Sequence, residues 1–385
     1  MEIRTADRLG QVEEYYFSKK LREVAALRAA GHDVINLGIG SPDLPPHPAV
    51  IRTLSEVAAQ TGSHGYQGYR GLPELRTAFA DWYGRYFGVH PDPDSEVLPL
   101  IGSKEGIMHI SMTYLQAGDE VLLPNPGYPT YAAVGRLTGA TLRYYDLRAD
   151  RQWQPDFEVL ERTDLSRVKL MWVNYPHMPT GAAASVELFE RIVDFGKRHN
   201  ILIVNDNPYA FILNERPLSI LSVPGAMEVA LELNSLSKCL NMAGWRVGAV
   251  VGSADRLQEI LRFKSNMDSG MFRPVQLAAA RALQLDEEWY SSLNGVYRER
   301  REAARAFLQA LHCSVAGDQY GMFLLGGLPE GYENGYQLAD ELLDRYRIFL
   351  TPGGIFGSNT DRYVRISLCS PVEVFEAATA RLTTA

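Results

Sequence analysis

The chain has 385 residues, of which 46% are hydrophobic and 22% are charged, a composition that excludes the disordered and fibrous classes. Its formal net charge of −8, without a long run of Lys and Arg, argues against nucleic acid or an anionic membrane surface as the main partner. The three cysteines include no C-x-x-C pair and the eight histidines no H-E-x-x-H motif, so we expect neither a disulfide framework nor a metal site.

Long apolar segments are absent from the sequence. Residues 1–21 contain no apolar run of the kind found in signal peptides. No stretch of about 18 apolar residues is present that could span a bilayer. We therefore expect a cytoplasmic protein without a membrane-spanning helix, whose cysteines stay reduced.

Between residues 95 and 252, strand-like and helix-like segments alternate. Apolar residues at helical spacing predict a helix over 107–116, and the amphipathic segment 185–200 predicts a second helix. Short continuous apolar runs predict buried strands at 120–124, 168–173, 201–204, 227–233 and 247–252. Such an alternation is typical of an α/β fold with a mostly parallel sheet covered by helices on both faces.

The last third of the chain has a different pattern. Residues 287–311 predict one long helix, and a last helix is expected after Ser370. Strands are predicted at 322–329, 348–352 and 363–368. We expect a large α/β domain over residues 46–285 and a smaller α+β domain made of residues 1–45 and 286–385.

Polar side chains follow three of the predicted strands of the large domain. Asn174 follows the 168–173 strand, Asp206 the 201–204 strand and Lys238 the 227–233 strand. Ligands of open parallel sheets bind beyond the carboxyl ends of the strands, so these three residues are expected to share one crevice. The helix that begins within residues 101–106 is expected to lie near it.

The residue types in this crevice fit pyridoxal phosphate. Asp206 ends an apolar strand and needs a cationic partner such as a protonated ring nitrogen. A desolvated Lys238 beside the cation Arg246 is biased towards the neutral amine, the nucleophile that forms a Schiff base. Free N–H groups at the helix start near Ser103, together with serine hydroxyls and Arg246, suit a phosphate. A lysine, a carboxylate for a ring nitrogen and a phosphate cradle describe a pyridoxal phosphate site.

Seven motifs, in order along nearly the whole chain, resemble those of the class I/II pyridoxal-phosphate aminotransferases of fold type I. They are INLGIGSPDLPPHP (35–48), GYQGYRGLPELR (65–76), GSKEGI (102–107), PNPGYPTY (124–131), NDNPYAFI (205–212), SLSKCLNMAGWRVG (235–248) and YVRIS (363–367). Residues 264–279, KSNMDSGMFRPVQLAA, are most similar to the branch that holds LL-diaminopimelate and alanine aminotransferases. The resemblance implies transfer of an amino group from an L-amino acid to a 2-oxo acid, expected to be 2-oxoglutarate, by a ping-pong mechanism.

The resemblance also implies roles for residues around the cofactor ring. Lys238 would form the internal aldimine and then move a proton between the substrate Cα and the cofactor C4′. Asp206 would keep the pyridine nitrogen protonated. Tyr209 would donate to the phenolic oxygen, Tyr128 would stack on the ring, and Asn174 would also contact the cofactor.

A further set of residues is implied for the phosphate and the substrate. The implied phosphate ligands are Ser103, Lys104, Ser235, Ser237 and Arg246, with the partner subunit's Tyr66. Arg365 would bind the substrate α-carboxylate bidentately, with the backbone of Gly40 nearby. Because Tyr66 would come from a neighbouring copy, a homodimer is expected.

One position departs from the family pattern. The family motif N-P-T-G reads Met178-Pro179-Thr180-Gly181, so methionine replaces the asparagine that contacts the phenolic oxygen and the substrate carboxylate. Methionine cannot donate that hydrogen bond, so either Tyr209 and Asn174 suffice or His177 substitutes. Loss of a donor to the phenolate is expected to raise the aldimine pKa. An absorbance titration should find a lower pKa in a Met178→Asn variant; an equal or higher one would contradict the expectation.

Other interpretations remain open. Taken alone, Lys238 is a surface amine, Asp206 a turn former, and Arg246 and Arg365 salt-bridge partners. Arg273 is either an interface salt bridge or a cation that reaches across a dimer to a second substrate carboxylate. At the level of function, the alternatives are a carbon–sulfur β-lyase of the same fold, which shares the same cofactor residues, and a non-catalytic regulatory domain.

Overall fold

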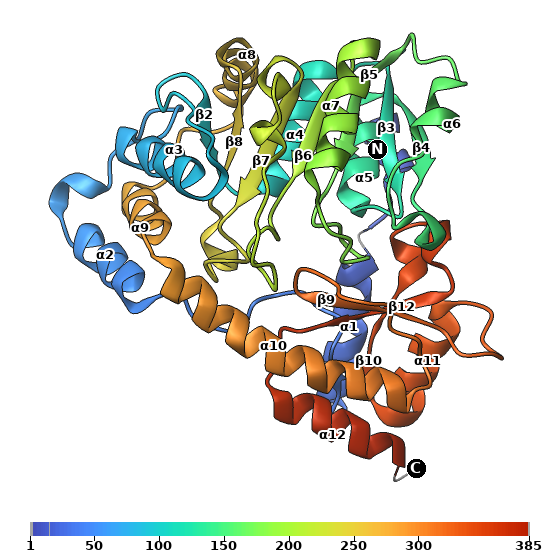
Figure 1. Ribbon diagram of the computed structural model, residues 1–385. Coiled ribbons are helices and arrows are strands. Elements are labelled where there is room, and N and C mark those ends of the chain that lie inside the picture. Colours follow the sequence, from blue (N-terminus) through green and yellow to red (C-terminus); the bar gives the residue numbers. More distant parts are fainter. Residues whose placement is uncertain (1–2, 15, 384–385) are drawn as a thin grey trace.

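A seven-stranded sheet forms the centre of the larger part of the molecule (Figure 1). The computed structural model describes residues 3–14 and 16–383. In spatial order the strands are β2 (Val97–Leu100), β8 (Gly248–Gly252), β7 (Ala230–Ser235), β6 (Leu202–Asp206), β5 (Val168–Val173), β3 (Glu120–Asn125) and β4 (Thr141–Asp146). β8 runs antiparallel to β2 and β7, and the other neighbours are parallel. The predicted mostly parallel sheet is confirmed.

Side chains alternate between the two faces of this sheet, and each face is covered by helices. On β5, Leu170 and Trp172 belong to one apolar cluster, and Met171 and Val173 belong to another. The first cluster includes residues of α4 (Ser103–Tyr114), α5 (Pro129–Thr138) and α8 (Ala254–Lys264). The second includes residues of α3 (Pro73–Phe87) and α7 (Val186–His199). Burial on both faces explains why the strands read as continuous apolar runs rather than as alternating ones.

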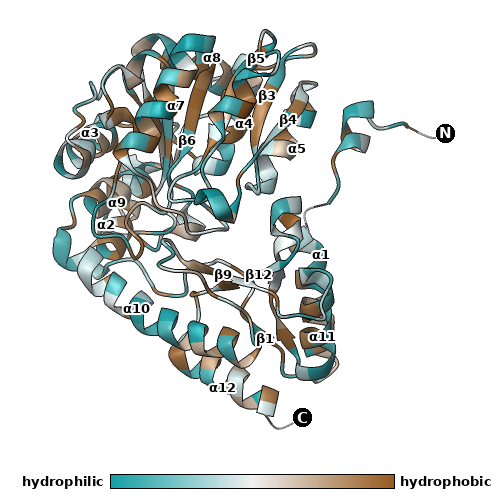
Figure 2. Ribbon diagram, turned by 45° about the vertical axis from the view of Figure 1, so that its right-hand side comes forward, coloured by the Kyte–Doolittle hydropathy of each residue, from teal (hydrophilic) through white to brown (hydrophobic). Residues whose placement is uncertain are grey.

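Three further helices complete the larger part of the molecule. α2 (Pro48–Ala58) lies beside α9 (Arg273–Leu283), which also contacts α3, and α6 (Phe157–Glu161) is short. The prediction of α7 is confirmed in detail, because Ser185 caps it by accepting a hydrogen bond from the Leu188 N–H at 3.1 Å. Figure 2 shows hydrophobic residues concentrated on the strands of the sheet.

The remaining elements gather below the large sheet in Figure 1. They are α1 (Tyr16–Ala29), β1 (Ile35–Asn36), α10 (Glu287–Ala310), β9 (Phe323–Gly327), α11 (Gly335–Tyr346), β10 (Ile348–Phe349), β11 (Thr351–Pro352), β12 (Tyr363–Ser367) and α12 (Val372–Thr383). β1 pairs in parallel with β10, which joins the N-terminal segment to the C-terminal third. β9, β12 and β11 form an antiparallel sheet. We propose residues 46–285 and residues 1–45 with 286–385 as the two domains.

Two predicted strands were wrong in their extent. Residues 227–229 are not strand, because Gly225 adopts a positive φ of 75° and Ala226–Glu228 form a 3-10 turn before β7. The single strand predicted over 348–352 is divided between two sheets, because β10 pairs with β1 while β11 pairs with β12. β2 and β4 were not predicted. Among residues 3–14 and 16–383, no helix is long and apolar enough to cross a membrane.

Candidate active site

A cavity of about 710 Å³ lies at the carboxyl ends of the central strands. Asn174 comes directly after β5, Asp206 is the last residue of β6, and Lys238 follows β7 by three residues. All three line the cavity, so the crevice expected from strand order is present. The predicted residues that also line it are Gly40, Ser103, Lys104, Tyr128, Tyr209, Ser235, Ser237, Arg246 and Arg365.

Lys238 is held inside this cavity by the backbone of the other domain. Its Nζ donates a hydrogen bond to the Gly40 carbonyl oxygen at 2.8 Å. Burial lowers the pKa of Lys238 from 10.5 to about 8, and the nearby cations Arg365 and Arg246 act in the same direction. Desolvation and Arg246 were both expected from the sequence, whereas the contribution of Arg365 was not.

The lowered pKa of Lys238 predicts the pH dependence of its reactivity. Only the neutral amine attacks acetic anhydride, and an amine with a pKa near 8 is about one-tenth neutral at pH 7. In the cofactor-free protein, the acetylation rate of Lys238 is therefore expected to rise up to about pH 8 and then level off. Residue-resolved mass spectrometry measures this rate. A rate that still rises steeply between pH 9 and 10, as for an ordinary lysine of pKa 10.5, would contradict the prediction.

Asp206 is paired with a tyrosine that was not predicted. The Tyr131 hydroxyl donates to Asp206 Oδ2 at 2.7 Å, and the Tyr131 ring stacks on Trp172 with centroids 4.8 Å apart. Burial raises the pKa of Asp206 to about 7, and the hydrogen bond from Tyr131 opposes that rise. Tyr131 lies three residues after Tyr128 at the start of α5, and both side chains line the cavity. Residues three apart lie on the same face of a helix, so the spacing from Tyr128 is the feature from which Tyr131 could have been predicted as a cavity residue.

Serine and arginine side chains gather at the start of α4. Gly102 precedes the helix with a φ of 81°, and an added Cβ there would collide with the Arg246 guanidinium. Arg246 Nη1 donates to the Ser237 hydroxyl at 3.4 Å, and the Ser235 and Ser237 hydroxyls are 2.9 Å apart. Helix N–H groups, two hydroxyls and a guanidinium thus face the same end of the cavity.

These residues fit pyridoxal phosphate. Asp206 Oδ1 is buried and has no hydrogen-bond partner within residues 3–14 and 16–383, so it is available to a ring N–H. The donors at the start of α4 suit the phosphate group. Lys238 lines the same cavity, together with Tyr128 and Tyr209. Burial raises the pKa of Tyr209, so its phenol stays a hydrogen-bond donor.

Arg365 extends from β12 into a group of aromatic rings. Its Nη2 donates to the Gly38 carbonyl oxygen at 2.9 Å. Its guanidinium carbon lies 3.9 Å from the Phe323 ring centroid, 4.7 Å from that of Phe356 and 5.5 Å from that of Phe17. These rings fix the orientation of a cation that is buried at the cavity wall.

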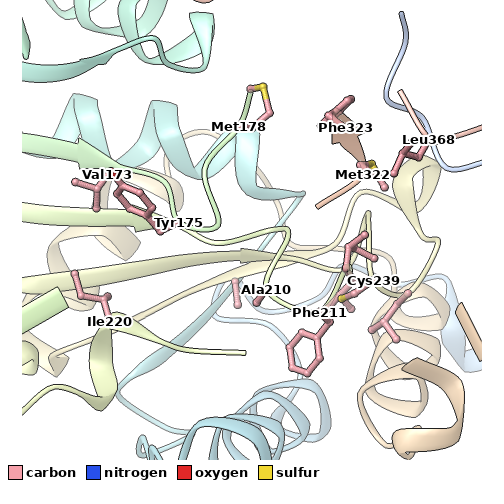
Figure 3. Close-up of a cluster of buried hydrophobic side chains, with 14 of the residues drawn as sticks. Val173, Tyr175, Met178, Ala210, Phe211, Ile220, Cys239, Met322, Phe323 and Leu368 are labelled. Atoms are coloured by element: carbon pink, nitrogen blue, oxygen red, sulfur yellow. The ribbon is translucent and has the colours of Figure 1, made fainter. Parts of the chain in front are cut away.

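Met178 contacts Arg365 directly. Arg365 Nη1 lies 3.3 Å from Met178 Sδ, and Figure 3 places Met178 on the same side of the buried cluster as Phe323. The position that holds an amide in the family motif therefore presents a thioether to the guanidinium. Asn174 is already engaged on this side, because its Oδ1 accepts from Met178 N at 2.9 Å and its Nδ2 donates one of its two hydrogens to the Asp206 carbonyl oxygen.

His177, the other suggested substitute for the missing amide, lies elsewhere. It is absent from the described residues that line the cavity. Its Nδ1 is 2.8 Å from the Thr180 hydroxyl, and burial lowers its pKa to about 3. His177 is therefore not placed to replace the missing amide.

Two residues considered from sequence lie outside the cavity in this chain. Tyr66 is 94% exposed and is not among the described lining residues. Arg273 is the first residue of α9 and likewise does not line the cavity within the described part of the chain. Any role of either in substrate or cofactor binding would therefore be exerted in a neighbouring copy.

A cluster of possible metal ligands was not expected from the sequence. Glu105, His109 and Asp268 bring ligand atoms within 4.8 Å of one another. However, the Lys264 ammonium lies 2.8 Å from Asp268 Oδ2 and also donates to the Tyr69 carbonyl oxygen at 3.1 Å. A buried ammonium already balances this carboxylate, so we assign no metal to the cluster.

Known proteins similar to this chain are aminotransferases. The sequence profile of the family Aminotransferase class I and II matches residues 32–381. An LL-diaminopimelate aminotransferase of Dehalococcoides mccartyi is 39% identical, and the match covers 99% of this chain and 98% of the relative. One of Aquifex aeolicus is 38% identical, and the match covers 97% of each chain. The solved structure of substrate-bound BacF from Bacillus subtilis has a TM-score of 0.94 and 34% identity, covering 99% of this chain and 97% of that one.

Both the coverage and the sequence identity of these matches exceed what a shared fold alone would give. The profile spans the cavity residues from Ile39 to Arg365, and the match to the Dehalococcoides mccartyi relative covers 99% of the chain. The predicted family, fold type and cofactor are confirmed. The chain belongs to the class I and II aminotransferases, which are pyridoxal-phosphate-dependent transaminases of fold type I.

Proposed function

We propose that the enzyme moves the amino group of an L-amino acid to 2-oxoglutarate in a ping-pong reaction, with Lys238 as the residue that holds the cofactor and moves the proton. The supporting observation is the meeting of Lys238, Asp206 and Arg365 in one cavity. These supply an amine of lowered pKa, a buried carboxylate and a carboxylate-binding guanidinium.

Each of these residues has a defined task. Bound pyridoxal phosphate supplies the electron sink and the carbonyl carbon that receives the amino group. Lys238 Nζ, once free, moves a proton between the substrate Cα and the cofactor C4′. Asp206 Oδ1 accepts the N–H of the ring nitrogen and keeps it protonated, while Tyr131 fixes Oδ2. Tyr209 donates to the phenolic oxygen.

The charges of the cavity support an anionic acceptor. The charged residues that line it, in the described part of the chain, are the cations Lys104, Lys238, Arg246 and Arg365 and the single carboxylate of Asp206. Lys104 and Arg246 are assigned to the phosphate and Lys238 to the cofactor, which leaves Arg365 to attract a carboxylate of an acceptor such as 2-oxoglutarate. Arg365 is the proposed ligand of the α-carboxylate, because its planar fork can bind two oxygens at once.

Transamination and β-elimination are separated by what is released. The holoenzyme is incubated with an L-cysteine thioether and no 2-oxo acid. The proposal predicts no continuous formation of pyruvate and thiol, and it predicts glutamate when 2-oxoglutarate and an amino donor are supplied. Steady release of pyruvate and thiol would instead establish the lyase alternative. Absence of any bound cofactor would favour a non-catalytic regulatory domain.

We further propose a cytoplasmic homodimer in which the partner subunit's Tyr66 contacts the phosphate. The position of Tyr66 supports this, because its side chain is exposed, lies outside the cavity of its own chain and is accessible to a neighbouring copy. Activity is therefore expected to fall on dilution into the monomer range, measured together with mass by analytical ultracentrifugation. Full activity of the monomer would contradict the shared site.

A further inference from the structure

The wall of the cavity near Arg365 is apolar. Phe17 and Leu21, one turn apart on α1, line the cavity together with Ile39, Phe323 and Phe356. The rings of Phe17, Phe323 and Phe356 lie within 5.5 Å of the Arg365 guanidinium carbon. A substrate whose α-carboxylate is bound by Arg365 therefore has its side chain within reach of these apolar groups.

Met178 makes the same region more apolar. Its thioether lies 3.3 Å from Arg365 Nη1, where the family motif has an amide. Methionine is flexible and polarisable and adapts well to apolar or aromatic groups beside it. It offers no hydrogen-bond donor to a polar substrate group.

The distribution of charge disfavours a substrate with a second ammonium group. Among the described lining residues the carboxylate is that of Asp206, which lies at the end of β6 and is bonded to Tyr131. α1 contributes Phe17, Ser18 and Leu21, none of which is charged. A distal ammonium would lose hydration without gaining an anionic partner among these residues.

We propose that the amino donor is an amino acid with an apolar side chain, aromatic or large aliphatic, rather than a diamino dicarboxylic acid. Two relatives that are 39% and 38% identical to this chain are named for LL-diaminopimelate, which has a second ammonium and a second carboxylate at its far end. This inference rests on the proposed transamination. It assigns donor selection to the wall made by Phe17, Leu21 and Met178.

The test is the first half-reaction alone, which needs no acceptor. The holoenzyme is mixed with L-phenylalanine, L-leucine, L-alanine or LL-diaminopimelate, and the rate of the absorbance change of the bound cofactor is measured at several donor concentrations. The initial slope of this rate against donor concentration gives the second-order rate constant for each donor. L-Phenylalanine or L-leucine is expected to exceed LL-diaminopimelate by at least about 10-fold, the range that one apolar pocket contact provides.

A charge placed on α1 provides a matched pair of variants. Leu21→Glu puts a carboxylate at the cavity wall, whereas Ala26→Glu puts the same charge on an exposed position of α1 outside the cavity. Leu21→Glu is expected to lower the value for L-phenylalanine by about 10-fold and to raise the value for LL-diaminopimelate, whose distal ammonium gains a partner. Ala26→Glu is expected to leave both values unchanged.

The outcomes separate this inference from the function on which it rests. Faster reaction of LL-diaminopimelate than of every apolar donor overturns the inference on the donor class and leaves transamination intact. Equal effects of Leu21→Glu and Ala26→Glu overturn the role of the α1 wall. If no donor changes the cofactor spectrum, the proposed transamination fails and this inference fails with it.

Discussion

Replacing Lys238 by alanine is expected to lower kcat by at least about 10³-fold, because a positioned proton-transfer group alone contributes 10²–10⁴-fold. Lys238 Nζ is buried, has its pKa lowered to about 8, and donates to the Gly40 carbonyl oxygen at 2.8 Å. No neighbouring amine can replace it, since Lys104 lies at the start of α4, where we propose that it serves the phosphate. Steady-state kinetics with a saturating donor measure the loss.

The control for Lys238→Ala is Lys169→Ala, which removes an exposed lysine of β5. Its kcat is expected to match that of the parent enzyme. The Lys238→Ala protein should also keep the parent circular dichroism spectrum and melt cooperatively, so that the loss cannot be assigned to unfolding. A Lys238→Ala enzyme with more than about one-tenth of the parent kcat would contradict the assigned role.

Replacing Asp206 by asparagine is expected to lower kcat/KM by about 10²–10³-fold, as expected when one partner of a buried charge pair loses its charge. Asparagine keeps the size of the side chain and can still accept from Tyr131, which now donates at 2.7 Å. It cannot hold the cofactor ring nitrogen protonated, so the substrate Cα proton is removed more slowly. The deuterium isotope effect on a Cα-deuterated donor should therefore increase, and competition kinetics measure it.

Tyr131→Phe is the companion variant for Asp206→Asn. It removes one hydrogen bond to a charged group, worth about 1.5–3 kcal/mol, but leaves the carboxylate charge in place. That hydrogen bond lowers the Asp206 pKa, so its loss should raise the pKa further in the cofactor-free protein. A smaller loss of activity than in Asp206→Asn is expected. An equal or larger loss in Tyr131→Phe would show that the tyrosine, not the charge, is essential.

Much of the site could be predicted because parallel strands align their carboxyl ends. Asn174 and Lys238 follow, and Asp206 ends, a strand that is buried on both faces, and the largely apolar runs of such strands are visible in the sequence. Strand order then places the three residues along one edge of the sheet. The wrongly predicted start of β7 did not affect the prediction of the site, because Lys238 follows the end of that strand.

Contacts between distant segments could not be predicted in this way. The Phe17, Phe323 and Phe356 rings around Arg365 come from α1, β9 and the loop before β12, and no local pattern indicates that they meet. The division of residues 348–352 between two sheets has the same origin, since it depends on which segments lie beside them. Tyr131 is an intermediate case, because its spacing from Tyr128 was visible but its bond to Asp206 was not.

The sequence shows that Met178 departs from the family motif N-P-T-G, and the structure shows that it contacts Arg365. Its sulfur lies against Arg365, which connects the unusual residue to the carboxylate-binding side of the cavity. The expected effect on the cofactor pKa and the proposed apolar donor therefore concern the same residue but different measurements. The Met178→Asn variant can be used for both.

The most direct test of this account is to identify the lysine that holds the cofactor. The holoenzyme is treated with sodium borohydride, which fixes the cofactor to that lysine, and the digested protein is analysed by mass spectrometry. The account predicts one modified peptide, with the reduced cofactor on Lys238 and the loss of the visible absorbance. Modification of Lys104 or of any other lysine instead, or the absence of a reducible chromophore, would contradict it.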